Sequence, residues 1–135
     1  MLNKIGITGS SGSLGKIILK NRKNFRIIKF NGDIRNRKKV FNWITKNKIK
    51  SIIHLAAIVP IKVVNLNKKK AYNVNLGGTK NIVDASIKNH INWFFFSSTS
   101  HVYKSSNKKI SENFSKKPIS FYGKTKLLAE NYIIK

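Results

Sequence analysis

The chain has 135 residues, no cysteine and a formal net charge of +24. Its length predicts one domain with a core of its own, the lack of cysteine excludes disulfides and thiolate chemistry, and no apolar run reaches the roughly 18 residues that predict a membrane span. The basic residues are spread along the whole sequence without the signature of a nucleic-acid-binding module, so we expect no specific nucleic-acid partner and no membrane.

A strand followed by a helix is predicted at the start of the chain. Residues 4–8 form a short apolar run that is typical of a buried parallel strand, and apolar residues at helical spacing follow from 14 to 19. A strand this close to the first residue leaves no room for a signal peptide, which, with the lack of cysteine and of membrane spans, predicts a cytoplasmic location.

Three glycines at every third position separate this strand from its helix. Gly9 tolerates a backbone conformation that side chains disfavour, Gly12 lets the main chain approach a pyrophosphate, and Gly15 lets the helix pack close to the strand. The positive end of the helix would then face the phosphates, although a flexible loop is the simpler alternative. The turn residues expected to contact a dinucleotide are Gly9, Gly12, Ser13, Leu14 and Gly15.

A second buried strand is predicted over residues 25–30, followed by Asn31-Gly32 as a turn. Asp33 and Ile34 come next and lead into a helix with apolar residues on one face. On the residues alone, Asp33 is either a cap of that helix or a contact for a ligand.

A third buried strand is predicted over residues 51–59, where Pro60 ends it. His54 within it is expected to be a core histidine with its hydrogen bonds satisfied rather than an acid or base. A helix is predicted from residue 68 to residue 88, and close packing against the sheet would explain its Gly77-Gly78 pair, which otherwise weakens a helix.

The fourth predicted strand, residues 92–97, is apolar without alternation, which predicts burial on both faces. It ends in a cluster of hydroxyl side chains that includes Thr99, at the sheet edge where ligands of parallel sheets bind. The last helix carries Tyr122 and Lys126, which are four residues apart and therefore share a face. A surface Tyr and Lys in a lysine-rich chain is the alternative interpretation.

Five landmarks in this order resemble the extended short-chain dehydrogenases/reductases, specifically the NAD-dependent epimerase/dehydratase family. They are the glycine turn, Asp33 after the second strand, His54-Leu-Ala-Ala57, the Ser-Ser-Thr99 strand end and Tyr122-x-x-x-Lys126. The resemblance implies an α/β fold, a Rossmann-like doubly wound parallel sheet of expected strand order 2-1-3-4. The resemblance covers residues 1–135, which would form an NAD(P)-binding domain. This domain corresponds to the N-terminal part of family members, without their C-terminal substrate-binding region, so the sheet would be truncated.

The resemblance also implies roles for individual residues. Thr99 aligns with the family's active-site hydroxyl, Tyr122 with its acid/base, which also binds the cofactor, and Lys126 with its cofactor-holding lysine. A neighbouring ammonium would favour the phenolate and so lower the pKa of Tyr122. The remaining residues that the family pattern places at the cofactor are Asp33, Ile34, Leu55, Ala56, Ala57 and Asn75.

The activity that the resemblance implies is hydride transfer between NAD or NADP and a nucleotide-sugar, as an epimerase, dehydratase or reductase. The acid that usually ends the second strand is missing from Lys29-Phe30-Asn31, which leaves the choice of cofactor open. The alternative is a nucleotide-binding module without catalysis of its own, whose sheet a second chain or a second copy would complete. The sequence predicts no metal site.

Overall fold

Four parallel strands form the centre of the structure, a computed structural model that describes residues 4–22 and 25–135. The strand order is β2-β1-β3-β4, which confirms the prediction. A crossover between parallel neighbours needs a helix, so every pair of consecutive strands is joined through helical segments. The strands are β1 (Lys4–Thr8), β2 (Arg26–Lys29), β3 (Ser51–His54) and β4 (Trp93–Phe96).

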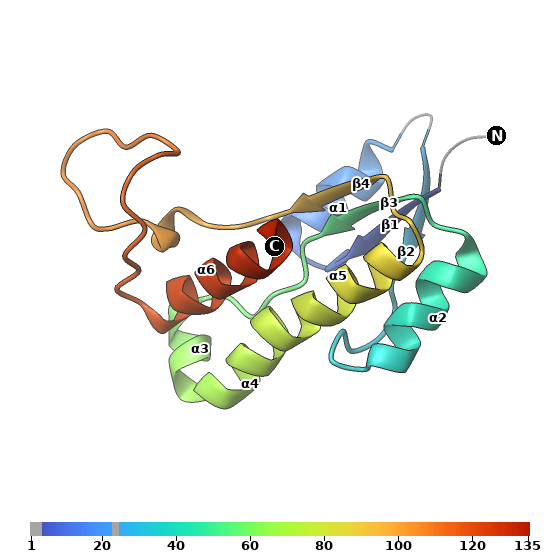
Figure 1. Cartoon of the computed structure of the whole chain (residues 1–135), viewed down its shortest axis with the longest axis horizontal. Coiled ribbons are helices and arrows are strands. Elements are labelled where there is room, and N and C mark those ends of the chain that lie inside the picture. Colours follow the sequence, from blue (N-terminus) through green and yellow to red (C-terminus); the bar gives the residue numbers. More distant parts are fainter. Residues whose placement is uncertain (1–3, 23–24) are drawn as a thin grey trace.

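Helices lie on both faces of this sheet, but unequally (Figure 1). Helix α5 contacts both α2 and α6, and these three helices cover one face of the sheet. The right-handed β1–α1–β2 crossover places α1 on the other face. The helical segments are α1 (Ser13–Lys20), α2 (Arg37–Asn47), α3 (Ile61–Leu66), α4 (Lys68–Tyr72), the π-helix η1 (Asn73–Gly78), α5 (Thr79–Lys88), the 3₁₀ helix η2 (Ser100–Val102) and α6 (Phe121–Ile134).

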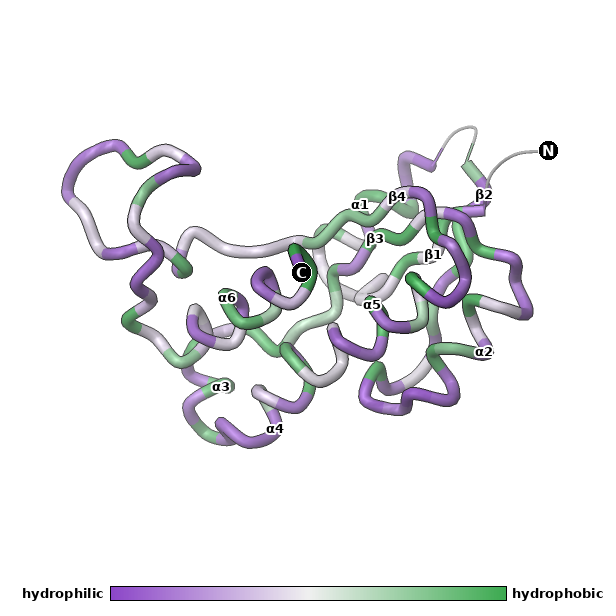
Figure 2. Tube along the Cα trace, viewed as in Figure 1, coloured by the Kyte–Doolittle hydropathy of each residue, from purple (hydrophilic) through white to green (hydrophobic). Residues whose placement is uncertain are grey.

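The hydrophobic core lies between the sheet and the pair α2 and α5, and Figure 2 shows the hydrophobic stretches of the trace running through the strands. Gly6 in β1 makes room for it, because a Cβ there would lie 2.7 Å from the Trp43 ring of α2. The buried core residues are Phe30, Ile34, Val40, Ile44, Ile49, Ile52, Ile82 and Ala85.

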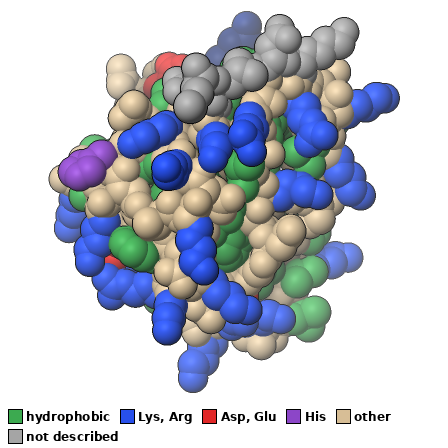
Figure 3. All heavy atoms as spheres, turned by 90° about the vertical axis from the view of Figure 1, so that its right-hand side faces the viewer, with side chains coloured by type: hydrophobic (Ala, Val, Ile, Leu, Met, Phe, Trp, Pro, Cys, Tyr) green, Lys and Arg blue, Asp and Glu red, His purple; other side chains and the backbone are tan. Residues whose placement is uncertain are grey.

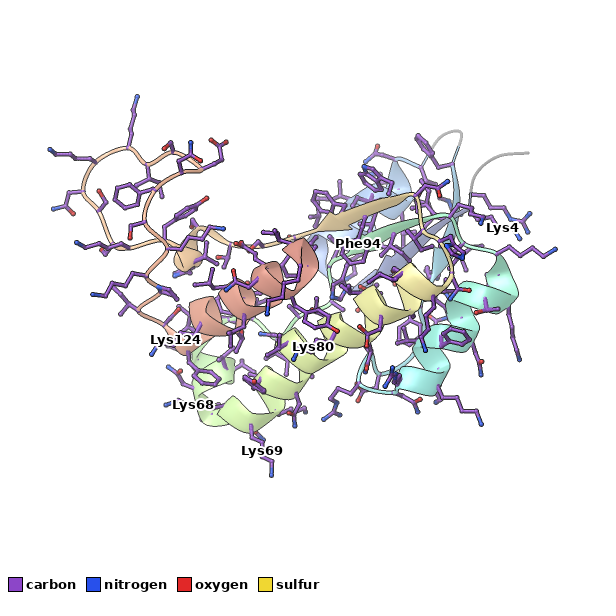
Figure 4. The ribbon with its side chains drawn as sticks, in the orientation of Figure 1. Lys4, Lys68, Lys69, Lys80, Phe94 and Lys124 are labelled. Carbon is purple, nitrogen blue, oxygen red and sulfur yellow. The ribbon has the colours of Figure 1, made fainter. Side chains whose placement is uncertain are left out.

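Strand β4 is not buried on both faces, so that prediction is wrong. Phe94, labelled in Figure 4, packs against the core, but Trp93 and Phe95 point to the opposite face and are 52% and 41% exposed. Their rings stack on each other with centroids 6.2 Å apart. Within the described residues β4 is an edge strand, and no helix covers this side of it.

The helix predicted over residues 68–88 is interrupted in its middle by the π-helix η1. The close packing expected of the glycine pair holds for Gly78, where a Cβ would collide with the side chain of Ile34. It is wrong for Gly77, which has no atom within 4 Å of a Cβ position. The packing partner is the segment after β2 rather than a strand.

Basic side chains are dispersed over the surface. On the face shown in Figure 3, Lys and Arg alternate with other residues instead of gathering in one patch. Lys69 extends away from α4 into solvent (Figure 4), whereas the ammonium of Lys68 lies 5.8 Å from the centre of the Phe121 ring. Among the helices of residues 4–22 and 25–135, none combines the length and the apolar character that crossing a bilayer requires.

Candidate cofactor cleft and active site

The loops that follow the four strands line one large cleft of about 1170 Å³. This is the edge at which open α/β sheets bind ligands. The turn after β1 contributes Gly9–Gly15, the segment after β2 contributes Phe30–Arg35, the segment after β3 contributes Leu55–Val59, and the end of β4 is followed by Ser97. The predicted cofactor residues in the cleft wall are Gly9, Gly12, Ser13, Leu14, Gly15, Asp33, Ile34, Leu55, Ala56 and Ala57.

The three glycines of the turn meet different constraints. Gly9 has φ +71°, and a Cβ there would lie 2.7 Å from the backbone nitrogen of Ala56. A Cβ at Gly15 would lie 2.5 Å from the carbonyl oxygen of Gly9. At Gly12 a Cβ would meet only that same oxygen, at an ordinary 3.4 Å. The fold therefore requires glycine at positions 9 and 15, whereas the space beside Gly12, which a side chain could fill, is part of the cleft.

The first turn of α1 faces this cleft with its backbone N–H groups. Gly12 is the N-cap residue, and no side chain caps the helix. Ser13, Leu14 and Gly15, the first three residues of the helix, all line the cleft. Unpaired N–H groups and the positive end of a helix dipole attract anions, so this turn suits a diphosphate.

A buried hydrogen-bond chain holds the wall formed by the segment after β3. The Thr8 hydroxyl accepts from the Ala56 N–H (3.3 Å) and lies 2.6 Å from His54 Nδ1. His54 Nε2 lies 2.9 Å from the Thr79 hydroxyl, which donates to the carbonyl of Asn75. Because the Thr79 proton is committed, His54 donates from Nε2 and accepts at Nδ1 as a neutral ring. The prediction of a satisfied core histidine is confirmed, and burial lowers the pKa of His54 to about 3.

Asn75 supports the cleft from behind rather than lining it. It is 1% exposed, its Oδ1 accepts from the Ile58 N–H (2.7 Å), and its Nδ2 donates to the Ile58 carbonyl (3.1 Å) and to the Thr125 hydroxyl (3.2 Å). Ile58 itself is in the cleft wall. In this structure Asn75 holds the backbone that forms the cleft wall, and its contact with a cofactor stays a prediction.

Asp33 lies in the cleft wall with its carboxylate engaged by Arg35. The backbone N–H of Arg35 donates to Oδ1 (2.9 Å) and its Nε donates to Oδ2 (2.9 Å), and this hydrogen bonding lowers the pKa of Asp33. The alternative role as a helix cap is wrong, because Asn36 caps α2 by accepting from the Lys39 N–H (3.0 Å).

Tyr122 lies at a second, smaller pocket of about 480 Å³, to which Val59 of the cleft wall also contributes. Gly123 allows this placement. It has no side chain, so α6 can approach η2 closely, whereas any Cβ at this position would collide with the His101 carbonyl. The Thr99 hydroxyl accepts from the His101 N–H (3.2 Å), which leaves its own proton available. The residues around this pocket are Val59, Pro60, Ile61, Lys62, His101 and Tyr122.

The ionisation of Tyr122 differs from the expectation. Burial raises the pKa of Tyr122, and interaction with the Thr99 side chain opposes this shift only in part. The predicted lowering by Lys126 is wrong for this structure. The Lys126 ammonium donates to the Ser97 carbonyl (2.6 Å) and lies 3.9 Å from the centre of the Phe96 ring, and burial lowers the pKa of Lys126 to about 8.

His101 is a site residue that sequence reasoning missed. Its ring meets the Tyr122 ring edge-on with centroids 6.1 Å apart, at the mouth of the smaller pocket. Its position two residues after Thr99 was the available signal, but about 20 residues of chain separate it from Tyr122. Within residues 4–22 and 25–135, no three His, Cys, Asp or Glu side chains are grouped to hold a metal ion.

Comparison with known proteins places this chain in a family. Residues 5–135 match the NAD dependent epimerase/dehydratase family. Two curated relatives are a UDP-glucose 4-epimerase of Rhizobium meliloti (strain 1021), 30% identical over 73% of this chain and 30% of its own, and a dTDP-4-dehydrorhamnose reductase of Aggregatibacter actinomycetemcomitans, 31% identical over 95% of this chain and 46% of its own.

Solved structures agree with this placement. The dTDP-4-dehydrorhamnose reductase from Bacillus anthracis str. Ames, in complex with NADP, matches 99% of this chain and 50% of its own with a TM-score of 0.91 and 26% identity. The UDP-glucose 4-epimerase of Thermus thermophilus, in complex with NAD, shares the fold with a TM-score of 0.89 over 97% of this chain and 50% of its own, at 19% identity. The chain therefore spans between 30% and 50% of the length of these relatives.

Proposed function

Because the chain belongs to the NAD dependent epimerase/dehydratase family, we propose that it is the cofactor-binding and proton-transferring part of an enzyme that acts on nucleotide-sugars by hydride transfer. The reaction is an epimerisation, dehydration or reduction. The observation that carries this proposal is the close packing of α6 on η2 at Gly123, which places Tyr122 at the smaller pocket beside His101, where the Thr99 side chain interacts with the phenol.

The chain's own residues fit NAD or NADP. The uncapped first turn of α1 and the empty space at Gly12 would hold the diphosphate, while Asp33 and Ile34 would border the adenine. Lys126 would hold the nicotinamide end, next to the Ser97 carbonyl. The chemistry that a bound nicotinamide supplies is release or acceptance of a hydride at a sugar carbon.

Proton transfer in this proposal is the task of Tyr122. Its raised pKa keeps the phenol protonated at neutral pH, so Tyr122 is ready to donate a proton from Oη to a sugar carbonyl oxygen as hydride arrives at the carbon. Thr99 donates a second hydrogen bond to the same oxygen, since its hydroxyl proton is not used by the His101 N–H. In the reverse direction Tyr122 takes the proton back.

A turnover assay with Tyr122→Phe tests this role. The chain is mixed with NADH or NADPH and a panel of UDP- and dTDP-linked 4-keto-hexoses, and loss of the reduced nicotinamide absorbance is followed. We expect Tyr122→Phe to reduce turnover by about 10²–10⁴-fold while the variant still binds the dinucleotide. Tyr72→Phe, an exposed tyrosine on α4, is the matched control and should keep wild-type turnover. Equal turnover of Tyr122→Phe and wild type would refute the acid/base role.

A second candidate function is that of a nucleotide-binding module that depends on a partner chain. The observation that favours it is the exposed face of β4 with Trp93 and Phe95, an apolar surface on an edge strand. This module would bind dinucleotide without turnover. Turnover that appears only when a chain carrying the C-terminal half of a family member is added would support it, and full turnover of the chain alone would exclude it.

A further inference from the structure

We propose that this cleft selects NADP(H) over NAD(H) through basic side chains at the end of β2, an inference that rests on the proposed function. In dinucleotide-binding sheets the end of the second strand meets the adenosine ribose. An Asp or Glu there binds the 2′-hydroxyl of NAD, whereas a cation there accommodates the 2′-phosphate of NADP. The segment Phe30–Arg35 occupies this place in the cleft wall, and we call it the ribose segment.

The ribose segment offers no free carboxylate to a ribose diol. The first residue after β2, Phe30, is buried in the core beside Trp43. Asn31 follows, exposed and in the cleft wall, with a neutral amide where NAD-selective sites carry an acid. Asp33 is the one carboxylate among the described residues that line the cleft, and both of its oxygens already accept hydrogen bonds from Arg35.

Cations surround the same segment. Arg35 and Lys70 line the cleft, and Lys70 is close enough to Asp33 to help lower the pKa of that carboxyl. The stem of Lys39 lies beside Gly32, with Cδ 3.9 Å from the position of a Cβ there. Arg35 is therefore paired with Asp33, whereas Lys70 in the cleft wall and Lys39 beside Gly32 take part in none of the ion pairs found among the described residues.

This balance favours a phosphate over a hydroxyl. A phosphomonoester carries a charge of about −1.5 to −2 at neutral pH and offers strong acceptor oxygens. Cations such as Lys39, Arg35 and Lys70 form charge-assisted hydrogen bonds with these oxygens, which are about twice as strong as neutral ones. The excess of lysine elsewhere on the chain attracts the diphosphate of both dinucleotides alike, so only the ribose segment distinguishes them.

Binding measurements test the proposal without requiring enzymatic turnover. Titration calorimetry at fixed salt compares NADPH with NADH, and 2′,5′-ADP with 5′-AMP, two pairs that differ only in the 2′-phosphate. We expect NADPH and 2′,5′-ADP to bind at least about tenfold more tightly than their counterparts, as charge-assisted contacts to one phosphate predict.

Two variants locate the source of this preference. Asn31→Asp restores the missing acid at an exposed position, and we expect it to weaken NADPH and strengthen NADH until the ratio of their affinities is inverted. Lys70→Gln should weaken NADPH about three- to tenfold and leave NADH nearly unchanged. Lys124→Gln removes the same charge from an exposed site on α6, outside the cleft, and should preserve the wild-type ratio.

The outcomes separate this inference from the proposed function. Equal binding of both dinucleotides, or tighter binding of NADH, overturns the selection of NADP(H) while the dinucleotide site stands. A wild-type ratio in Asn31→Asp or in Lys70→Gln overturns the assignment to the ribose segment. Binding of neither dinucleotide to a chain with native circular dichroism contradicts the proposed function itself.

Discussion

Each glycine of the turn between β1 and α1 meets a different constraint, although the three are evenly spaced in the sequence. Gly9 and Gly15 are required because backbone atoms occupy the positions of their side chains, whereas the space beside Gly12 opens into the cleft. The close packing predicted at Gly15 is confirmed. Gly12 has the open space that a ligand needs, and the approach of a pyrophosphate there stays a prediction. Which glycine a mutation can change without unfolding the protein follows only from the structure.

Stability measurements should separate these glycines. We expect Gly15→Ala to lower the free energy of unfolding by about 2 kcal/mol or more, because its Cβ collides with the Gly9 carbonyl, which cannot move without opening the turn. At Gly12 the backbone has φ −72°, which alanine also adopts, and a Cβ has free space, so Gly12→Ala should change the free energy of unfolding by at most about 0.5 kcal/mol. Urea denaturation of both variants measures this difference, and equal losses would contradict the assignment.

His54 should make the protein sensitive to acid. Its pKa is about 3 in the folded chain and 6.5 as the ordinary value, so the unfolded chain binds more protons between these values. Stability should therefore fall as the pH drops below 6.5, by up to about 1.4 kcal/mol per pH unit. Protonation would also leave the Thr8 hydroxyl without its acceptor.

Urea unfolding at pH values from about 7 to about 4.5 checks this dependence. The variant His54→Gln, which cannot gain a proton, should lose the slope. His90→Asn is the matched control, since His90 is exposed with φ 51°, a conformation that Asn also tolerates, and the slope should remain. A slope that persists in His54→Gln would show that other groups cause it.

Among the elements, the strands were predictable and the helix irregularities were not. Apolar runs located all four strands, because burial in a parallel sheet selects continuous apolar residues. The end predicted for the third strand is wrong, since β3 stops at His54 and not at Pro60. The π-turn of η1 depends on side chains that are distant in sequence, since Gly78 packs on Ile34 and Asn75 bonds to Ile58. Composition and periodicity do not predict such contacts between residues that are distant in sequence.

The junction between η2 and α6 should be intolerant of any side chain at Gly123. A Cβ there would collide with the His101 carbonyl, so Gly123→Ala should push α6 away, separate Tyr122 from Thr99 and lower the free energy of unfolding by about 1–3 kcal/mol. Thermal unfolding of the variant measures this loss. Gly77→Ala in η1 is the control, because open space surrounds Gly77 and alanine favours helix, so its stability should hold or rise. The same melting temperature for both variants would contradict the role of Gly123.

The order of the sheet and the position of the cleft could be predicted from the sequence, but the burial of β4 could not. An apolar strand is buried only where another element covers it, and one face of β4 is uncovered within the described residues. The net charge of +24 likewise comes from basic residues dispersed over the surface rather than from one binding patch. Composition alone does not show that some of these residues, Arg35 and Lys70, line the cleft at or near the ribose segment.

The ionisation of the active site also depends on the whole fold. The spacing of Tyr122 and Lys126 predicted a lowered pKa for the tyrosine, but burial raises it, and the ammonium of Lys126 is held by the Ser97 carbonyl directly after β4. Sequence spacing fixes which residues share a helix face, whereas the desolvation of each group is set by elements far along the chain.

Titration of the chain with NADH and NADPH, followed by nicotinamide fluorescence, shows whether the cleft at the strand ends binds a dinucleotide. We predict saturable binding to the wild type and to Gly77→Asp, whose new side chain points into open space. Gly12→Asp, which places a carboxylate where the diphosphate should lie, is predicted to keep wild-type stability but lose binding by more than about a hundredfold. A folded wild type without saturable binding, or a Gly12→Asp variant with wild-type affinity, would contradict dinucleotide binding in this cleft.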